Sequence, residues 1–264
     1  MDISQTLTLS VVQGITEFLP VSSSAHLVLI TKLFAWPEQG IDFDIILHVG
    51  TLIAVLLYFR KELIKLLNPF YNLTHKIILA TLPVCFAGLI FKDYIELYLR
   101  KNNIALVIAF STIFFGLLLG FAQSKERNNI HNFHNITYWQ SFLIGCAQCF
   151  ALIPGASRLG LTMTMAMLLG VNRKAAAEFS FLLSIPVISL SGLKVAYELT
   201  RNPALMTAGV TNYLLGLVAA ALVAVVSMNL FMKLLNKIGI LPFVVYRLIL
   251  GSVILGCLIL NYKM

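Results

Sequence analysis

The chain contains few charged residues: 11% of its 264 residues are Asp, Glu, Lys or Arg, whereas 59% are hydrophobic. Soluble globular domains have about a quarter of their residues charged, so this composition excludes an ordinary soluble domain and favours the lipid bilayer as solvent. Acidic residues are scarcer than basic ones: the chain has 11 Asp and Glu against 19 Lys and Arg, which gives a net charge of +8. Because no compact basic patch accompanies that charge, no nucleic-acid partner is expected.

Cysteine is equally scarce, and four cysteines in a chain of this length cannot form a disulfide scaffold. Cys146 and Cys149 form a CxxC pair, but no second pair or histidine cluster supplies the other ligands of a structural zinc site. Helix packing is therefore the favoured interpretation of this pair, with metal or redox chemistry as the alternative. The N-terminal residues lack the pattern of a removable signal peptide, so none is expected.

Long apolar stretches occur six times in the sequence. A helix needs about 20 apolar residues to cross a hydrocarbon core of about 30 Å. The six stretches are residues 43–59, 77–91, 104–122, 177–198, 212–235 and 241–260. Pro83, Pro186 and Pro242 predict kinks or early helix ends within them. The sequence thus predicts an all-α polytopic membrane protein that forms a single membrane domain over residues 1–264.

Two further apolar regions, residues 5–34 and 139–170, are broken near the middle by proline followed by small and polar residues, in LPVSSSAH and IPGASR. A half-helix of about ten residues rises about 15 Å, which reaches the membrane midplane and no further. Each region therefore predicts a re-entrant hairpin of two half-helices. Non-helical backbone at that depth is tolerated only inside protein or beside a wet cavity, so both breaks are candidate functional sites.

The two breaks resemble each other. Pro20 and Pro154 are each followed three residues later by a serine, and Gln13 and Gln148 stand on the helices that lead in. Each half then contains a hairpin and three crossings, and because three is odd the second half enters from the opposite side. This pattern predicts an inverted repeat with its site where the broken helices meet. The predicted repeats are residues 1–123 and 138–264, and the polar segment 123–137 joins them.

This topology divides the basic residues unevenly. One side receives ten of them, namely Arg60, Lys61, Lys65, Lys76, Lys125, Arg127, Arg173, Lys174, Lys233 and Lys237. The other side receives seven, namely Lys32, Lys92, Arg100, Lys101, Lys194, Arg201 and Lys263. The positive-inside rule then places the first side in the cytoplasm and both termini outside.

Polar residues gather at the first break. Gln13 and Glu17 lie four residues apart and so share one face of the incoming half-helix. Three serines follow, any of which can cap the outgoing half-helix: Ser22, Ser23 and Ser24. His26 then falls in the first turn of that half-helix. A charged or ionisable side chain inside a membrane is a functional candidate by default.

The second break adds Ser157, which can cap the outgoing half-helix, and Arg158 and Thr162, which share one of its faces. Two positive helix N-termini would then face each other and, with an arginine fork and several hydroxyls, form a phosphate site. The histidine, serine and glutamate of the first break are also parts that phosphoryl transfer needs. Alternatively, Glu17 and Gln13 could hold a divalent cation, and the residues leave both roles open.

Each candidate also has a structural interpretation. Glu17 could simply pair with Arg158, and Ser or Thr hydroxyls commonly bond to helix carbonyls or neighbouring helices. His48, in LHVGTLIAV, could face the cavity but is interpreted mainly as a structural or supporting residue. Arg247, in VVYRLIL, is interpreted as a structural partner for a helix end.

Over essentially its whole length the chain resembles the undecaprenyl-diphosphate phosphatases of the bacitracin-resistance (BacA-type) family. QGITEFLPVSSSAH matches the family's glutamate-rich first motif, and PGASRLGLT matches its second motif, usually PGxSRSGxT. The chain departs from the family at Gln13, where many members have glutamate, at Ala25, where glycine is common, and at Leu159, where serine is common. With Glu17 as the only carboxylate of the first motif, a metal site of two carboxylates is in doubt.

The resemblance implies an enzyme of the bacterial cytoplasmic membrane that depends on a divalent cation, Mg²⁺ or Ca²⁺. It would remove the terminal phosphate of undecaprenyl diphosphate at a site open to the periplasmic side, recycle the lipid carrier for cell-wall synthesis, and confer bacitracin resistance. The expected catalytic residues are Glu17, Ser23, His26 and Arg158, with Glu17 also as metal ligand. The expected substrate-binding residues are Gln13, Ser22, Ser24, Ser157 and Thr162.

In the mechanism we expect, Ser23 is the nucleophile or a close phosphate ligand. His26 relays the Ser23 proton or attacks phosphorus itself, and Glu17 orients that histidine or holds the metal. The sequence leaves open whether Ser23, His26 or water is the attacking group. It also leaves open a homodimer and a carrier that moves the lipid monophosphate across the bilayer.

Overall fold

The computed structural model describes residues 2–66, 68, 70–94, 104–126, 129–201 and 203–260. In these ranges the backbone is helical apart from turns and an isolated bridge between Ile130 and Val171. The all-α prediction is therefore confirmed. Some residues named above, Arg100, Lys101, Arg127 and Lys263, lie outside the described residues, as does part of the 123–137 linker.

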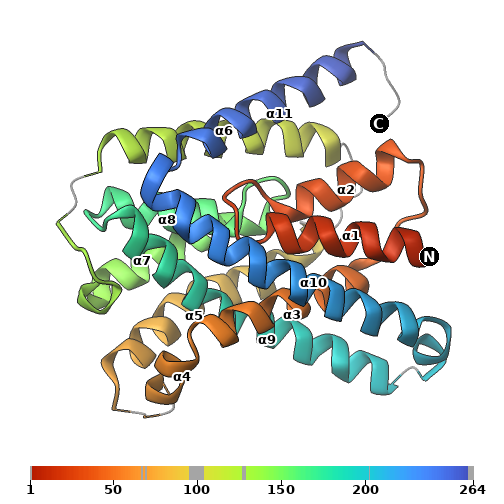
Figure 1. Cartoon of the computed structure of the whole chain (residues 1–264), viewed down its shortest axis with the longest axis horizontal. Helices are drawn as coiled ribbons and strands as arrows, with labels where there is room; N and C mark the ends of the chain where they lie inside the picture. Colours follow the sequence, from red (N-terminus) through yellow and green to blue (C-terminus); the bar gives the residue numbers. More distant parts are fainter. Residues whose placement is uncertain are drawn as a thin grey trace.

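The helices follow one another in the order shown in Figure 1. They are α1 (Ile3–Thr16), α2 (Ser23–Leu33), α3 (Ile41–Tyr58), α4 (Arg60–Leu66), α5 (Asn72–Tyr94), α6 (Ile104–Ser124), η2 (Phe133–Asn135), α7 (Tyr138–Gln148), η3 (Cys149–Leu152), α8 (Arg158–Leu168), α9 (Arg173–Arg201), α10 (Pro203–Ile238) and α11 (Leu241–Ile259).

Six helices are long and apolar enough to cross a membrane, and they coincide with the six predicted crossings. Their apolar spans are Ile41–Tyr58, Asn72–Phe91, Ile104–Ser124, Arg173–Glu198, Val210–Ile238 and Leu241–Ile259. Together with the all-α fold, these spans define a multi-pass membrane protein.

Of the kinks or early helix ends predicted at proline, the early ends do not occur at Pro83 or Pro186. Pro83 and Pro186 lie inside α5 and α9, which continue through them. Neighbouring helices and hydroxyl side chains can satisfy the backbone groups that proline frees in a membrane helix. Pro242 stands in the first turn of α11, where the missing N–H group has no intrahelical partner to lose.

Both broken regions contain two separate helices. In the first, α1 ends at Thr16 and α2 begins at Ser23; in the second, α7 ends at Gln148 and α8 begins at Arg158 after the short η3. The interruption of both regions is therefore confirmed. The outgoing helices α2 and α8 each have 11 residues.

The same capping device starts the two incoming helices. The Asp2 carboxylate accepts from the N–H of Gln5, whose side chain accepts from the N–H of Asp2. Thr137 and Gln140 form the same reciprocal capping box at the start of α7. The two caps are 135 residues apart (2 to 137), as are the first residues of α2 and α8 (23 to 158).

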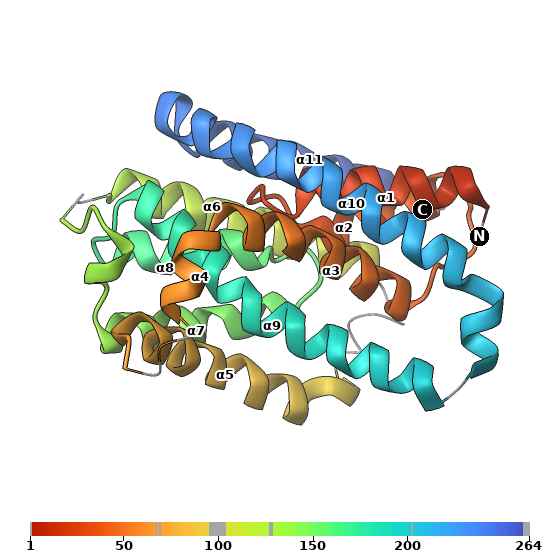
Figure 2. The same cartoon turned by 60° about the horizontal axis from the view of Figure 1, so that its bottom comes forward.

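The helices run mainly along the long axis of the molecule (Figure 1). Helix α10 packs on α1 and α3, α6 pairs with α11, and α5 pairs with α7. Helix α8 lies between these groups, in contact with α6, α7 and α9. Figure 2 shows α11 and α5 on opposite sides of the molecule. Helix α11 ends at the same end of the molecule at which α1 begins, while α4 lies at the other end (Figure 1).

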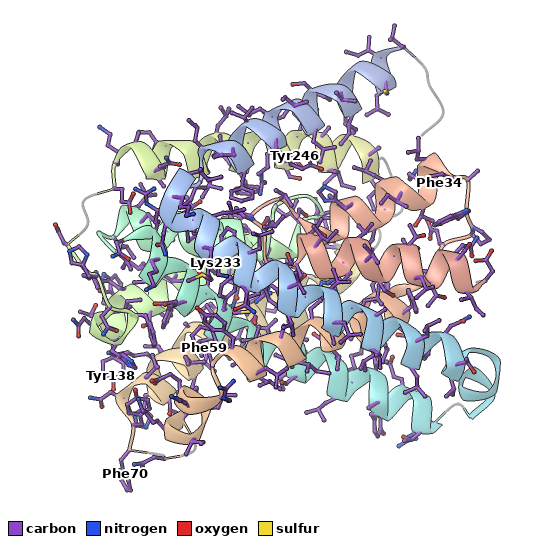
Figure 3. The ribbon with its side chains drawn as sticks, in the orientation of Figure 1. Phe34, Phe59, Phe70, Tyr138, Lys233 and Tyr246 are labelled. Carbon is purple, nitrogen blue, oxygen red and sulfur yellow. The ribbon has the colours of Figure 1, made fainter. Side chains whose placement is uncertain are left out.

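Aromatic side chains mark the two ends of the long axis. Phe34 lies toward one end, and Phe70 and Tyr138 lie toward the other (Figure 3). All three are exposed. Aromatic residues are enriched where a membrane protein meets the two membrane–water interfaces, so this arrangement fits helices that cross the bilayer along the long axis.

The four cysteines are free and partly buried. The Cys149 thiol contacts the carbonyl of Gly145 one turn earlier. Among the described residues, no group of three or more His, Cys, Asp or Glu side chains could hold a metal ion. Cys146 lies in α7 and Cys149 is the first residue of η3, so both belong to the second broken region.

Candidate active site at the two helix breaks

Each break contains a serine in a strained backbone conformation directly before the outgoing helix. Ser22 has φ 74° and Ser157 has φ 69°, in the region that residues other than glycine rarely adopt. Such a conformation costs on the order of 1–3 kcal/mol and is concentrated at functional sites. Gly155 also has a positive φ, and a Cβ there would overlap Ser111 and the Ile108 backbone.

A single buried arginine holds the two breaks together. The fully buried Arg247 guanidinium donates to the Pro20 carbonyl of the first break at 3.1 Å. It also donates to the Gly155 and Ala156 carbonyls of the second break, each at 3.1 Å. Nε of the same side chain donates to the Thr112 carbonyl of α6 at 3.1 Å. Arg247 is structural, as predicted, but it binds the breaks rather than a helix end.

Glu17, at the end of α1, is the centre of the polar cluster. Its carboxylate receives Nη2 of Arg158 on Oε1 at 2.6 Å and the Ser23 hydroxyl on Oε2 at 2.7 Å. The Gln13 amide donates to Oε2 at 3.0 Å, which confirms that Gln13 and Glu17 share a face. Since Ser23 and Arg158 are the first residues of α2 and α8, the N-termini of both outgoing helices converge on this carboxylate.

His48 of α3 is the fourth partner of Glu17. Its Nδ1 lies 2.7 Å from the Asp44 carbonyl, which can only accept, so Nδ1 carries a hydrogen. Its Nε2 lies 3.3 Å from Oε2 of Glu17. A carboxylate oxygen also only accepts, so a hydrogen on Nε2 is what makes this approach favourable. His48, which was considered as a supporting residue, thus contacts Glu17 directly.

The charges of this cluster suit an anionic ligand. One carboxylate, Glu17, faces the guanidinium of Arg158 and the imidazole of His48. The side chain of Glu17 is 4% exposed, whereas those of Arg158 and His48 are 16% and 27% exposed. A ligand entering the site therefore meets the two basic groups before the carboxylate. Guanidinium forks and helix N-termini both favour phosphate oxygens.

His26 lies in the first turn of α2, as predicted, but not in the predicted contact. Its Nδ1 lies 2.7 Å from the Ser22 carbonyl and its Nε2 lies 2.6 Å from the Tyr246 hydroxyl of α11. Ser23 donates its hydroxyl hydrogen to Glu17 rather than to His26. Of the two roles expected for Glu17, orienting His26 is not observed, because the histidine that reaches Glu17 is His48; holding a metal stays a prediction.

The remaining hydroxyls have mainly structural contacts. Ser157 caps α8 as predicted, since its Oγ accepts from the N–H of Gly160 at 3.2 Å. The predicted side-chain cap of α2 is not formed by Ser22, whose hydroxyl lies 3.3 Å from that of Ser24 instead. Thr162 is fully buried and donates to the carbonyl of Arg158 at 3.0 Å.

Two buried glutamines have unpaired amide atoms. Gln13 and Gln148 are both fully buried and lie 135 residues apart (13 to 148). Within the part of the chain that the structure describes, Oε1 of Gln13 and both amide atoms of Gln148 have no hydrogen-bond partner. Buried polar atoms are nearly always paired, so these amides have hydrogen-bonding capacity that the described protein groups do not use. Oε1 of Gln13 stands beside the Glu17 carboxylate as an unused acceptor.

Fold and site together define an α-helical membrane protein with a buried polar cluster at two interrupted helices. The sequence profile of the family described as bacitracin resistance protein BacA matches residues 6–253. The chain is 45% identical to undecaprenyl-diphosphatase 1 of Pseudoalteromonas translucida (strain TAC 125), covering 95% of this chain and 97% of that protein. It is 44% identical to undecaprenyl-diphosphatase 2 of Stutzerimonas stutzeri (strain A1501) and to undecaprenyl-diphosphatase of Campylobacter concisus (strain 13826). Each of these two matches covers 97% of this chain and 98% of the relative. The chain belongs to the BacA family.

Proposed function

We propose that the chain hydrolyses undecaprenyl diphosphate to undecaprenyl phosphate and inorganic phosphate. This reaction recycles the lipid carrier for cell-wall synthesis and thereby confers bacitracin resistance. Relatives that match nearly the whole chain carry the name undecaprenyl-diphosphatase. The observation that carries the proposal is the convergence of Ser23, His48 and Arg158 on the buried Glu17 carboxylate, between the N-termini of two helices.

Substrate binding exchanges one anion for another at Arg158. In the structure its guanidinium is paired with Glu17, and a diphosphate entering between the breaks offers it a doubly charged partner with more acceptor oxygens. First-turn N–H groups of α2 and α8, together with Ser22, Ser24 and Ser157, complete the oxygen contacts. Gln13 supports this site through its hydrogen bond to Glu17 and Thr162 through its hydrogen bond to the carbonyl of Arg158, and the apolar tail remains among the lipid-facing helix surfaces.

The same exchange activates Ser23. When Arg158 turns to the diphosphate, Glu17 loses its strongest counter-charge and accepts the Ser23 proton more readily. Oγ of Ser23 then bonds to the terminal phosphorus, the bond from that phosphorus to the bridging oxygen breaks, and undecaprenyl phosphate leaves. Glu17 passes the Ser23 proton to the bridging oxygen of the departing undecaprenyl phosphate. Water next cleaves the Ser23 phosphoester: Nε2 of His26 takes a proton from that water and returns one to Oγ of Ser23, and inorganic phosphate leaves. This assignment is supported by the 2.7 Å hydrogen bond from Ser23 to Glu17.

A divalent cation fits this site only together with the substrate. Glu17 supplies one carboxylate and Gln13 an unpaired buried oxygen, both suited to Mg²⁺ or Ca²⁺. Because the described residues contain no cluster of three acidic, His or Cys ligands, diphosphate oxygens and water would complete the shell. When bound, the cation would neutralise charge on the phosphate oxygens. We expect a chelator to abolish phosphate release and added Mg²⁺ or Ca²⁺ to restore it.

The decisive experiment measures inorganic phosphate released from an isoprenyl diphosphate by detergent-purified protein. Arg158→Ala and His26→Ala are expected to slow release at least about a hundredfold while the protein stays folded, by analogy with oxyanion donors worth about 2.7–4 kcal/mol. Arg201→Ala is the matched control, since Arg201 contacts only the Tyr197 ring in the described structure and its loss should not change the rate. Near-normal release by both site variants would place the active site elsewhere, and substrate binding without release by the wild type would favour a lipid carrier.

The attacking atom can be identified by trapping. With substrate labelled on its terminal phosphate, an acid quench preserves a phosphoserine but destroys a phosphohistidine. We expect acid-stable label on wild-type protein and none on Ser23→Ala. Ser24→Ala is the control, because the Ser24 hydroxyl contacts Ser22 rather than Glu17. Acid-labile label would transfer the role to His26, and no label at all would favour direct attack by water.

We further propose that the chain lies in the bacterial cytoplasmic membrane with the site open to the periplasmic side and both termini outside. The supporting observations are the excess of basic residues toward the end that holds α4 and the fact that α1 begins where α11 ends (Figure 1). A homodimer is compatible with this arrangement but nothing in the described contacts requires one.

A further inference from the structure

We propose that Tyr246 is a positioning residue for His26, a role that rests on the proposed function of the site. Its hydroxyl lies 2.6 Å from Nε2 of His26, although the two residues are 220 positions apart in the chain. Tyr246 belongs to α11, whereas His26 belongs to α2, so the contact joins a membrane-spanning helix to a half-helix of the first break. Neither motif of the sequence points to this tyrosine.

The hydrogen bonds of His26 define its tautomer. Nδ1 faces the Ser22 carbonyl at 2.7 Å, and because a carbonyl only accepts, Nδ1 carries the hydrogen. In a neutral imidazole Nε2 is then an acceptor, so the Tyr246 hydroxyl donates to it. At rest the lone pair of Nε2 accepts the Tyr246 hydrogen bond, and it takes a proton during the reaction once that hydroxyl turns away. Tyr246 therefore positions the nitrogen that moves the proton, whereas the Ser22 carbonyl holds the other nitrogen.

The two rings are also stacked. Their planes make an angle of 10° and their centroids are 5.7 Å apart. Stacking limits rotation of the imidazole out of this plane, and the two hydrogen bonds limit rotation within it. With both restrictions, His26 keeps a single orientation relative to the break.

The position of Tyr246 is itself fixed by the next residue. Arg247 is fully buried and donates to the Pro20, Gly155 and Ala156 carbonyls, so α11 is anchored to both breaks one residue from Tyr246. Figure 3 places Tyr246 near the middle of the long axis, between the aromatic residues at the two ends. The same helix thus sets the geometry of the breaks through Arg247 and of His26 through Tyr246.

Removing the hydroxyl should affect the reaction step rather than substrate affinity. Without it, Nε2 loses its donor and the imidazole can turn about its terminal torsion, so fewer molecules have the reactive orientation at any moment. Tyr246→Phe retains the ring and its stacking. We expect kcat to fall about tenfold and KM to change less than about twofold.

The test compares kcat and KM for purified wild type, Tyr246→Phe, His26→Gln and the double variant. The double variant should be no slower than His26→Gln alone, because Tyr246 acts through that histidine. Tyr138→Phe is the control, since its hydroxyl contacts Asn72 near the other end of the molecule and its removal should change neither constant. Unchanged kcat in Tyr246→Phe, a rise in KM alone, or independent effects in the double variant would each overturn the proposal.

A spectroscopic measurement tests the contact separately from activity. In protein labelled with ¹⁵N-histidine, the resonances lost in His26→Gln identify His26, and they should report a hydrogen on Nδ1. In Tyr246→Phe the Nε2 resonance should shift as its donor is lost. If the wild type released no phosphate, the proposed function would fail while this shift could still be observed. An unshifted resonance would overturn the positioning role even in an active enzyme.

Discussion

At Glu17 a single carboxylate gathers side chains from four helices, since Gln13, Ser23, His48 and Arg158 belong to α1, α2, α3 and α8. A buried carboxylate requires this many donors because isolated charge is expensive away from water. The number of donors also allows one of them to turn away from Glu17. Arg158, whose guanidinium binds a diphosphate more strongly than a single carboxylate, can turn to the substrate while Gln13, Ser23 and His48 still contact Glu17.

His48 permits a sharp test of this arrangement. In His48→Gln the side-chain amide keeps an N–H donor for Glu17, and we expect phosphate release within about threefold of wild type. In His48→Leu this donor is lost, and a hydrogen bond to a charged group contributes about 1.5–3 kcal/mol, so we expect release to fall tenfold or more. His131→Leu, on the linker, is the control. Equal rates for all three variants would mean that Gln13, Ser23 and Arg158 suffice to hold Glu17.

The sequence predicted much of this site because its motifs are local. Gln13 and Glu17 share a helix face by spacing alone, and the serines and Arg158 follow recognisable breaks. Tyr246 was not predicted as a site residue. The sequence alone gives a tyrosine in an apolar helix no polar partner, and its contact with His26 depends on how α11 packs against α2. The wrong histidine was assigned to Glu17 for the same reason. Which face of α3 meets the breaks depends on helix packing, which spacing does not specify.

Helix elements in this protein approach closely at glycines. A Cβ at Gly145 of α7 would overlap the backbone of Ala80 in α5, and a Cβ at Gly50 of α3 would overlap the Leu217 carbonyl of α10. Small residues at such crossings let membrane helices pack backbone against backbone. The contact at Gly145 positions α7, the incoming half-helix of the second break, against α5, and the contact at Gly50 positions α3, which carries His48, against α10.

We therefore expect Gly145→Ala to destabilise the protein even though alanine is the better helix former. The added methyl group meets backbone that cannot turn aside, and overpacking typically costs about 1–3 kcal/mol, or about 3–10 °C in Tm for a chain of this size. Gly88→Ala in α5 is the matched control, because a Cβ there meets nothing within 4 Å. Thermal unfolding in detergent checks both, and equal Tm values for the two variants would contradict close packing at Gly145.

Outside the membrane spans, a polar cluster ties α4 to the linker. Glu62 accepts from Lys65 at 2.7 Å and from the Tyr71 hydroxyl at 3.1 Å, and Tyr71 also contacts His134 at 3.0 Å. Burial acts to raise the pKa of the Glu62 carboxyl, but the hydrogen bonds from Lys65 and Tyr71 together with nearby positive charge hold that pKa below its ordinary value of 4.5. The ionised form of Glu62 is thus favoured by the fold.

The sign of the pH dependence follows from this lowered pKa. The contribution of Glu62 to stability is complete above pH 4.5 and is lost as the pH falls through the lowered value. At pH 7, Glu62→Gln should lower Tm by about 1–3 °C, since exposed ion pairs contribute about 0.2–1 kcal/mol. The difference from wild type should shrink as the pH falls below 4.5 and through the lowered pKa. Glu198→Gln, from the exposed Lys194–Glu198 pair, is the control, and a pH-independent difference for Glu62→Gln would contradict the assignment.

For the whole molecule, composition and hydropathy predicted the six crossings because each apolar stretch is long enough to be unambiguous. The exact ends were not predicted, since polar residues such as Asn72 and Arg173 extend the helices past their apolar parts. The spacing of 135 residues relates the caps, the glutamines and the strained serines of the two halves. This spacing supports an internal repeat, and three crossings between the hairpins favour an inverted one.

An inverted repeat with both breaks at mid-depth predicts which positions water can reach, and from which side. In a variant without the native cysteines, Ser24→Cys should react with a membrane-impermeant thiol reagent added to the outside of spheroplasts, because the partly buried Ser24 lies at the first break. An isoprenyl diphosphate should protect it. Val253→Cys, exposed on α11 toward lipid, should not react, since a thiol in hydrocarbon does not ionise.

Cysteines at the end of the molecule that holds α4 test the orientation of the protein in the membrane. Lys61→Cys and Lys125→Cys should react only after the membrane is permeabilised, because the positive-inside rule places them in the cytoplasm. Reaction of Ser24→Cys only from the inside would reverse the proposed orientation but keep the site. No reaction from either side, with Lys61→Cys behaving as expected, would mean that water does not reach the first break, and a hydrolytic site at Glu17 could not then operate.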